Sequence, residues 1–354
     1  MARVSILLPS LNAREFLEPR VRSLLQQTFA DWEAIVLDSQ SDDGTWEYFQ
    51  SIARTDPRFC LHQIPREGLY AALNRGLEHA GGEFLHIATC DDSMVPDFLA
   101  QMLAAFAPCP EAGIAACDVR FINRKGDDLS RADLVPHLTK RAANNLLSLD
   151  SVRTAFDDER PQNLNYRPVP HDCLLHFDGR SVYLSLNQLL IRTSLARTAG
   201  PFKTTIGSVA DFDWLLRLTS STGTVHFPEK LAMWRFHGNQ LSLQQDESRA
   251  TSRELSAKGA LADVDQRHPG LLSANDRAAL LLPLKLESAG KISGVAGWFE
   301  SAIRLGRMLL VRPPATWRAL FRVRLRFGTR RHTLLPMIFQ AIGLKPRDVA
   351  ELRR

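Results

Sequence analysis

The sequence predicts an α/β fold, built on a largely parallel sheet with helices on both faces. Three observations point to this fold. The first 120 residues alternate short β-rich runs with helical stretches, helix-boundary residues separate the two, and the composition is that of a globular protein. Hydrophobic residues make up 45% and charged residues 23% of the 354 residues, which argues against disorder. This length allows about two domains.

Five β-rich runs are expected to be strands of the sheet, at residues 4–9, 32–38, 59–64, 83–89 and 113–119. Helical stretches lie between them, at residues 15–27, 45–54, 69–80 and 96–107. Gly81 and Gly82 close the third helix, and Pro96 opens the fourth at a first-turn position. Strands that alternate with helices of this length form βαβ units, in which the strands run parallel.

The pattern changes after this region. Residues 124–180 are polar and contain several prolines, so we expect loops and short helices over one face of the sheet. A regular pattern returns at residues 185–194, followed by a helix around 208–219 and two short strands within 224–237. Beyond about residue 243 the chain reads as successive helices. No internal repeat is found.

Several classes of protein are excluded by what the sequence lacks. The cysteines show no CxxC pair, which favours reduced thiols in a cytoplasmic protein. No signal peptide and no run of ~20 apolar residues is present, so we expect a soluble or peripheral protein. The absence of GxGxxG, GxxxxGK[ST] and GxSxG argues against a dinucleotide oxidoreductase, a P-loop NTPase and an α/β-hydrolase.

The positive charge is concentrated at the C-terminus. Residues 301–354 contain 13 Lys or Arg against two acids, whereas the rest of the chain contains 31 basic and 37 acidic residues. Aromatic residues interleave with these arginines, which suits docking of residues 290–354 on an anionic membrane surface. The alternative is a set of solvated helices that pack on the rest of the chain or pair two chains as a homodimer. Nucleic acid is a less favoured partner, because no nucleic-acid module accompanies the tail.

Ligands of open α/β sheets bind beyond the carboxyl ends of the strands. Pro9 and Asn12 follow the first strand, and Asp38 ends the second in the run DSQSDDGT, which either forms a turn or accepts from a base or ribose. Asp91 and Asp92 follow the fourth strand. Adjacent carboxylates are costly unless a cation or ligand donor offsets them, and their oxygens suit Mg²⁺ or Mn²⁺. The alternative is that this pair caps the next helix.

In combination, these segments resemble the family 2 glycosyltransferases, which are inverting nucleotide-sugar transferases with the GT-A fold. VSILLPSLN is similar to the family's opening strand, and VLDSQSDDGT to the strand and turn that hold the uridine. GLYAALNRGLEHAGGEFLHIATCDDSMVPDFL resembles its central helix, strand and acidic metal motif. The resemblance implies a Rossmann-like GT-A catalytic domain over residues 1–240, with nucleotide-sugar binding in 1–120 and the acceptor side in 121–240. A helical, basic extension would occupy 241–354.

The resemblance also implies roles for the strand-end residues. Asp38 would contact the nucleoside, and Asp91 and Asp92 would hold Mn²⁺ or Mg²⁺ and the ribose–diphosphate. Thr89 stands where the first acid of the usual D-x-D is found, so the ligand role rests on the two aspartates. The implied nucleotide-binding residues are Pro9, Asn12, Asp38 and Asp91.

Two later segments extend the resemblance. In GSVADFDWLLRL, Asp211 matches the general base, with Asp213 in reserve because Ala210 replaces the common Glu. In MWRFHGNQLS, His237 matches a residue that reaches the cation or diphosphate, and Arg235 would neutralise phosphate. On the residues alone, Asp211 is an ordinary acid at a helix start, and His237 an ordinary core or surface histidine.

The resemblance implies a non-processive bacterial enzyme, because the Gln-x-x-Arg-Trp of processive synthases is absent. It would transfer one sugar, with UDP-linked donors favoured, to a glycan or lipid-linked acceptor in cell-surface polysaccharide or glycolipid synthesis. Such an enzyme would work in the cytoplasm or on the inner face of the plasma membrane. Two alternatives remain: a catalytically weak glycosyltransferase-like binding or scaffold module, and a sugar nucleotidyltransferase.

Overall fold

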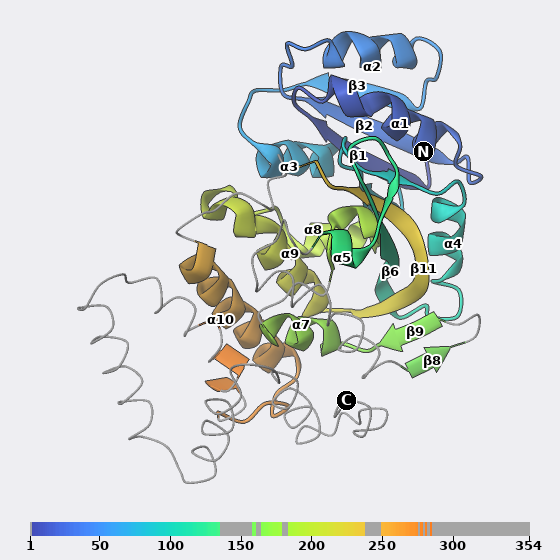
Figure 1. Cartoon of the computed structure of the whole chain (residues 1–354). Coiled ribbons are helices and arrows are strands. Elements are labelled where there is room, and N and C mark those ends of the chain that lie inside the picture. The colour runs from blue at the N-terminus through green and yellow to red at the C-terminus, as the bar shows by residue number, and fades with distance from the viewer. Residues whose placement is uncertain are drawn as a thin grey trace.

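The computed structural model describes residues 2–134, 158–160, 164–178, 183–237 and 249–274, followed by 277, 278, 280, 281 and 284. One mixed sheet runs through the described part (Figure 1), in the order β3-β2-β1-β4-β10-β6-β11-β9-β8. The predicted α/β class is therefore confirmed. The predictions for the basic tail fall on residues 290–354, which lie outside the described residues.

The first half of the sheet is parallel. Its elements alternate as the sequence predicts: β1 (Val4–Ser10), α1 (Arg14–Leu25), β2 (Trp32–Asp38), α2 (Thr45–Ala53), β3 (Phe59–Gln63), α3 (Leu69–His79) and β4 (Phe84–Ile87). β1 pairs in parallel with both β2 and β4. Strand order therefore reverses at β1, which makes the carboxyl ends of β1, β2 and β4 the place where a doubly wound sheet binds its ligand.

The second half of the sheet is mixed. It contains β5 (Ser93–Met94), α4 (Phe98–Ala104), β6 (Ala112–Ile122), β7 (Asp128–Leu129), α5 (Arg131–Leu134), β8 (Asp158–Arg160), β9 (Leu164–Arg167), β10 (Leu189–Arg192) and β11 (Gly223–Arg235). β10 lies antiparallel between β4 and β6, and β6 pairs in parallel with β11.

Two sequence-based expectations need correction here. Residues 224–237 do not form two short strands, because β11 continues from Gly223 to Arg235 and absorbs its irregular middle as shifts in register around Phe227 and Lys230. The polar region 124–180 is not only loops and short helices, since β8 and β9 form an antiparallel pair that extends the sheet beside β11.

The remaining described elements are helices: α7 (His171–Leu175), η3 (His176–Asp178), η4 (Leu186–Gln188), α8 (Thr193–Ala199), η5 (Thr204–Val209), α9 (Ala210–Thr219) and α10 (Arg249–Arg267). Both faces of the sheet are covered, because side chains alternate along β1. Val4, Ile6 and Leu8 pack with α1, α2 and α4, whereas Leu7 lies in the core that contains α3, α9 and α10.

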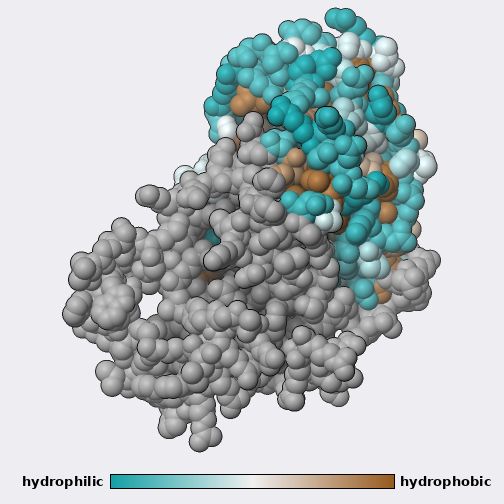
Figure 2. All heavy atoms as spheres, viewed as in Figure 1, coloured by the Kyte–Doolittle hydropathy of each residue, from teal (hydrophilic) through white to brown (hydrophobic). Residues whose placement is uncertain are grey.

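The described surface is ordinary for a globular protein. On the face seen in Figure 2 it is mainly hydrophilic, with hydrophobic residues in small areas, and the large hydrophobic side chains exposed among the described residues are Leu11, Leu25 and Leu255. Among the helices that the structure describes, none combines the length and hydropathy that a membrane span requires.

Candidate functional site

The loops after β1 and β2 interlock at the carboxyl edge of the sheet. The side-chain oxygen of Asn12 accepts a hydrogen bond from the backbone amide of Asp42 at 3.0 Å. The backbone amide of Asn12 donates to Ser41 Oγ at 2.9 Å. Asn12 and Gln40 both adopt positive φ, 48° and 54°, which is unusual for residues other than glycine. Such backbone conformations persist where surrounding contacts hold them, and they concentrate at binding sites.

Asp38 lies at the centre of this edge. It is fully buried, and its carboxylate accepts from Ser10 Oγ at 3.2 Å, Ser41 Oγ at 2.6 Å and the Ser41 amide at 3.0 Å. These contacts give Asp38 the turn-forming role that the sequence left open. Contact of Asp38 with a nucleoside stays a prediction.

Residues 89–93 follow β4 and are called the acidic loop here. Asp92 is 2% exposed, and both its oxygens are occupied: Oδ1 accepts from the Arg235 amide at 2.9 Å, and Oδ2 accepts from Thr89 Oγ1 at 2.8 Å and Ser185 Oγ at 3.3 Å. The Asp91 side chain is 28% exposed and lies 3.0 Å from Nε2 of His237. The adjacent aspartates therefore have different surroundings.

The surroundings shift the pKa values of the two carboxyl groups in opposite directions. Burial raises the pKa of Asp92 to about 7, and the nearby charge of Asp91 adds to this rise. Burial also opposes ionisation of Asp91, but the hydrogen bond from His237 and backbone donation outweigh it and hold the pKa of Asp91 below its ordinary value. Asp91 is thus the ionised, accessible carboxylate of the loop.

Asp91 and His237 fit a divalent cation of the kind that the sequence implies. Both groups are possible metal ligands, and to bind a cation His237 would have to give up its 3.0 Å hydrogen bond to Asp91. No group of three or more His, Cys, Asp or Glu side chains in the described part of the chain is arranged to hold a metal. A donor set of two suits Mg²⁺ or Mn²⁺, which takes its remaining ligands from water and substrate phosphates.

Arg235 supports the acidic loop from the end of β11. It is 3% exposed, and its guanidinium donates to the carbonyl oxygens of Asp91 at 2.7 Å, Asn123 at 3.0 Å and Arg124 at 3.1 Å. The sequence analysis expected Arg235 to neutralise phosphate. Its burial and its backbone contacts make it a support for the position of Asp91, and contact with a phosphate stays a prediction.

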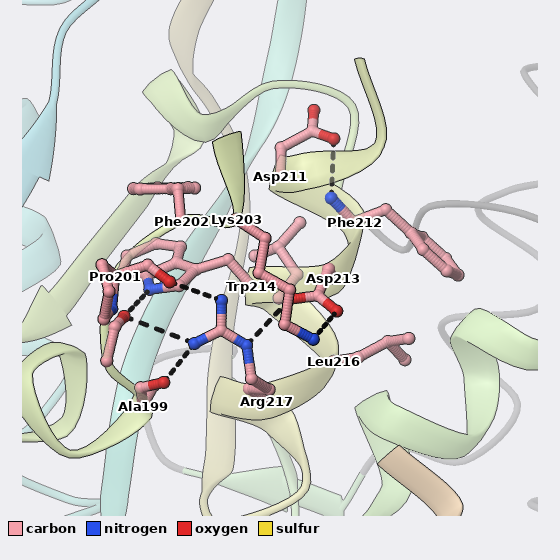
Figure 3. Close-up of polar contacts among 12 residues, drawn as sticks. Ala199, Pro201, Phe202, Lys203, Asp211, Phe212, Asp213, Trp214, Leu216 and Arg217 are labelled. Atoms are coloured by element: carbon pink, nitrogen blue, oxygen red, sulfur yellow. Dashed lines mark hydrogen bonds and ion pairs between the residues drawn. The ribbon is translucent and has the colours of Figure 1, made fainter. Parts of the chain in front are cut away.

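Asp211 and Asp213 come from a different element, the first turn of α9 (Figure 3). Asp213 is 2% exposed and pairs with Lys203 Nζ and Arg217 Nε, each at 2.8 Å. These cations outweigh the effect of burial and lower the pKa of Asp213. Asp211 is half-buried and accepts from the Phe212 amide at 2.6 Å, and in Figure 3 its carboxylate points away from Lys203 and Arg217.

The structure thus brings Asp91, Asp92, Arg235 and His237 together. It connects Pro9 to them, because the Pro9 carbonyl accepts from Cys90 Sγ at 3.2 Å. The sequence analysis missed two buried residues that hold the acidic loop, Arg20 and Asn187. A signal existed for Arg20, since it falls on the buried face of α1 between Leu17 and Leu24. Nothing in the sequence marks Asn187.

Part of the chain resembles known proteins in sequence. Residues 5–167 match the family model described as glycosyl transferase family 2. TuaG of Bacillus subtilis, named as a teichuronic acid biosynthesis glycosyltransferase, is 36% identical over 103 residues, which cover 28% of this chain and 40% of TuaG. A Campylobacter jejuni GalNAc(5)-diNAcBac-PP-undecaprenol beta-1,3-glucosyltransferase is 31% identical over 105 residues, which cover 29% of this chain and 34% of that protein. The chain therefore spans less than half the length of these curated relatives.

Solved structures share the fold. S. aureus TarS 1–349 in complex with UDP superposes with a TM-score of 0.55 at 14% identity, over 80% of this chain and 70% of that one. The same protein in complex with UDP-GlcNAc gives a TM-score of 0.54 at 12% identity, over 82% of both chains. At these identities the likeness concerns the fold.

Proposed function

We propose that this chain, whose residues 5–167 match the model of glycosyl transferase family 2, transfers one sugar from a nucleotide sugar to an acceptor hydroxyl with inversion. The observation that carries the proposal is the acidic loop. It lies at the point where strand order reverses, and it presents the ionised carboxylate of Asp91 beside His237. The diphosphate of a nucleotide sugar is the ligand class that suits this position.

Asp91 and His237 would hold Mn²⁺ or Mg²⁺, which would neutralise the negative charge of the departing diphosphate. Asp92, buried behind Asp91, would keep the loop in shape through its three donors. Arg235 would hold the Asp91 carbonyl from the opposite side. These contacts fix the loop backbone before the donor arrives, so little reorganisation would accompany binding.

Asp211 would take the proton of the acceptor hydroxyl as that oxygen attacks the anomeric carbon. In Figure 3 its carboxylate points away from Lys203 and Arg217, which neutralise Asp213, and this orientation supports the choice of Asp211. A single displacement of this kind inverts the anomeric centre and needs no covalent enzyme intermediate. Asp213 would then serve to hold α9 to the preceding loop.

The donor and acceptor follow from the relatives. We propose a UDP-linked donor, since the structurally similar TarS has been crystallised with UDP and with UDP-GlcNAc. A lipid-linked acceptor is proposed because the Campylobacter relative is named for a glycan on undecaprenyl diphosphate. The product would then belong to cell-surface polysaccharide or glycolipid synthesis, at the inner face of the plasma membrane. The basic tail, residues 290–354, would dock there on anionic lipid.

The test is turnover of a panel of UDP-, GDP- and dTDP-sugars, measured as nucleotide release with Mn²⁺ and with a chelator. We expect one UDP-sugar to be hydrolysed slowly without acceptor, and only with the cation. Nucleotide binding without turnover, even with lipid-linked acceptors added, would favour the binding-module alternative. Synthesis of a nucleotide sugar from sugar phosphate and nucleoside triphosphate would favour the nucleotidyltransferase alternative.

A further inference from the structure

A buried cation lies beneath the acidic loop. Arg20 is fully buried, although it stands in the middle of the apolar face of α1. Its Nε donates to the Thr89 carbonyl at 2.8 Å, and its Nη2 donates to Asn187 Oδ1 at 2.6 Å. Nη1 has no hydrogen-bond partner within the described residues. A guanidinium buried with incomplete hydrogen bonding is costly, so stability alone gives a poor account of Arg20.

Asn187 holds the C-terminal end of the acidic loop, at Ser93. It lies in η4, where the side chains of Ser185 and Gln188 form a capping box that fixes the turn. Its Nδ2 donates to the Ser93 carbonyl at 3.1 Å, while its Oδ1 accepts from Arg20. Arg20 and Asn187 therefore hold the first and last residues of the acidic loop and also hold each other. This pair is called the clasp here.

The clasp supplies charge as well as contacts. Burial lowers the pKa of Arg20, but an arginine stays protonated in proteins, and its charge attracts both Asp92 and Asp91. Arg235 approaches the loop from β11 and holds the Asp91 carbonyl. The loop backbone is thus fixed at Thr89, Asp91 and Ser93 by three side chains from three distant parts of the chain, which leaves the Asp91 carboxylate facing His237.

We propose that Arg20 and Asn187 are positioning residues of the donor site, which hold the acidic loop so that Asp91 meets the cation and diphosphate without reordering of the loop. The inference rests on the proposed function. Residues that orient a ligand from behind typically change metal affinity or activity by about 10–100-fold when replaced. The clasp also connects α1, within the expected nucleotide-sugar-binding residues 1–120, to η4, within the expected acceptor side. Ser185, beside η4, reaches the acidic loop as well, by its hydrogen bond to Asp92.

The experiment measures the Kd of UDP by calorimetry in excess Mn²⁺ for wild type, Arg20→Met and Asn187→Leu. Each variant should weaken binding by about 10–100-fold, and the double variant should lose little more than the worse single one, because the two residues act as one unit. Arg20→Lys, which can reach only one of the two acceptors, should restore part of the affinity. Asn187→Asp keeps an acceptor for Arg20 but loses the donor to Ser93, so it should fall between wild type and Asn187→Leu.

Gln27→Leu is the matched control. Gln27 is also a buried polar residue beside α1, and it bonds to the Val95 carbonyl and the Leu99 amide, just beyond the acidic loop. We expect this variant to lower the thermal midpoint while the folded protein keeps the wild-type Kd for UDP. An equal loss of UDP affinity in Gln27→Leu would reduce the clasp to a general contribution to stability and overturn the proposal.

Amide hydrogen exchange of the unliganded variants tests whether the clasp holds the acidic loop, and this test does not depend on nucleotide binding. The amides of residues 89–93 should exchange faster in Arg20→Met and Asn187→Leu than in wild type, and not in Gln27→Leu. If wild type binds no nucleotide, the proposed function fails, while exchange still reports whether the clasp holds the loop. If wild type binds UDP and the folded clasp variants, including Arg20→Lys and Asn187→Asp, bind it within twofold, the clasp is not a positioning device.

Discussion

Asp211 and Asp213 stand two residues apart in the first turn of α9, yet their surroundings differ in kind. Asp213 is buried against Lys203 and Arg217, whereas Asp211 is half-buried and directed away from both cations (Figure 3). Removing one partner of a buried ion pair leaves an uncompensated charge, which is strongly destabilising. Replacing a general base instead lowers the rate and leaves the fold unaffected.

Asp211→Asn should therefore lower turnover by ~10²–10⁴-fold with little change in the thermal midpoint or in UDP affinity. Asp213→Asn is the matched comparison, and it should lower the thermal midpoint clearly because Lys203 and Arg217 lose their common partner. Turnover assays and thermal unfolding of the two variants separate the roles. A crippled Asp213→Asn enzyme of normal stability beside a mild Asp211→Asn would reverse the assignment.

At the scale of elements, the alternation of β-rich and helical runs along the first 120 residues predicts most of the helices and strands there. β2 begins and ends where the apolar run indicates, and α3 and α9 differ from expectation by only a residue or two. The sequence predicts two strands in residues 224–237, but β11 pairs with β6 on both sides of its irregular middle and therefore continues as one strand. The short polar strand β8 is stabilised by its pairing with β9, and the local sequence of β8 does not indicate this pairing.

In the candidate site, too, some residues carry a local sequence signal and others depend on contacts that are distant in the sequence. Asp91 and Asp92 were found because adjacent acids after a strand are a local signal. Arg20, Asn187 and the inward orientation of Asp92 were not found, because they depend on contacts between segments about 70 to 170 residues apart in the chain. The support that Arg235 gives to the loop likewise depends on backbone acceptors that are distant in the sequence.

Close packing of α3 on the sheet gives a prediction at this scale. A Cβ at Gly76 would lie 2.6 Å from Leu37 Cδ1 and 3.0 Å from Leu7 Cδ2, so Gly76→Ala forces core side chains to move. It should destabilise the protein by about 1–3 kcal/mol. Gly259→Ala, in α10 with no atom within 4 Å, is the control and should stabilise by about 0.5–1 kcal/mol. Chemical denaturation measures both, and equal effects would mean that α3 does not pack as described.

For the whole molecule, buried histidines set a dependence of stability on pH. Burial lowers the pKa of His86 to about 3 and that of His176 to about 4. Below about pH 6.5 the unfolded chain binds protons at both residues and the folded chain does not, so stability falls as pH falls from about 6.5 towards 4. The pKa of Asp92 is about 7 in the folded chain, so between pH 7 and 4 the folded chain binds a proton there that the unfolded chain does not. This effect raises stability as pH falls, but it involves one residue, whereas the two histidines lower stability.

The thermal midpoint should therefore decrease between pH 7 and pH 5 in wild type, whereas in His176→Gln it should change little, because a single buried histidine then opposes Asp92. Asp92→Asn should make the decrease steeper, because it removes the opposing proton. Thermal unfolding across this range checks the sign for each protein. A wild-type midpoint that rises on acidification, or the same slope in all three proteins, would contradict the buried neutral histidines.

The basic tail gives a prediction that depends on the sequence alone. Residues 301–354 contain 13 Lys or Arg and two acids, and this positive charge should draw the chain to anionic vesicles, at ~1 kcal/mol per basic residue near the surface and less at high salt. Co-sedimentation should show binding to anionic vesicles, release by salt, and loss of binding after truncation near residue 290. Equal binding to neutral vesicles, or unfolding on truncation, would instead favour a structural tail.

The most direct test of the account is the affinity for UDP, measured by calorimetry with Mn²⁺ and with a chelator, in wild type, Asp91→Asn and the control Asp97→Asn. Asp97 is an acid six residues further along, at the start of α4, and outside the acidic loop. Wild type and Asp97→Asn should bind UDP more tightly with the cation, and Asp91→Asn should lose that difference, because an amide is a poorer ligand than the ionised carboxylate beside His237. Equal affinity for UDP with and without the cation in wild type, or an unchanged cation effect in Asp91→Asn, would contradict the account.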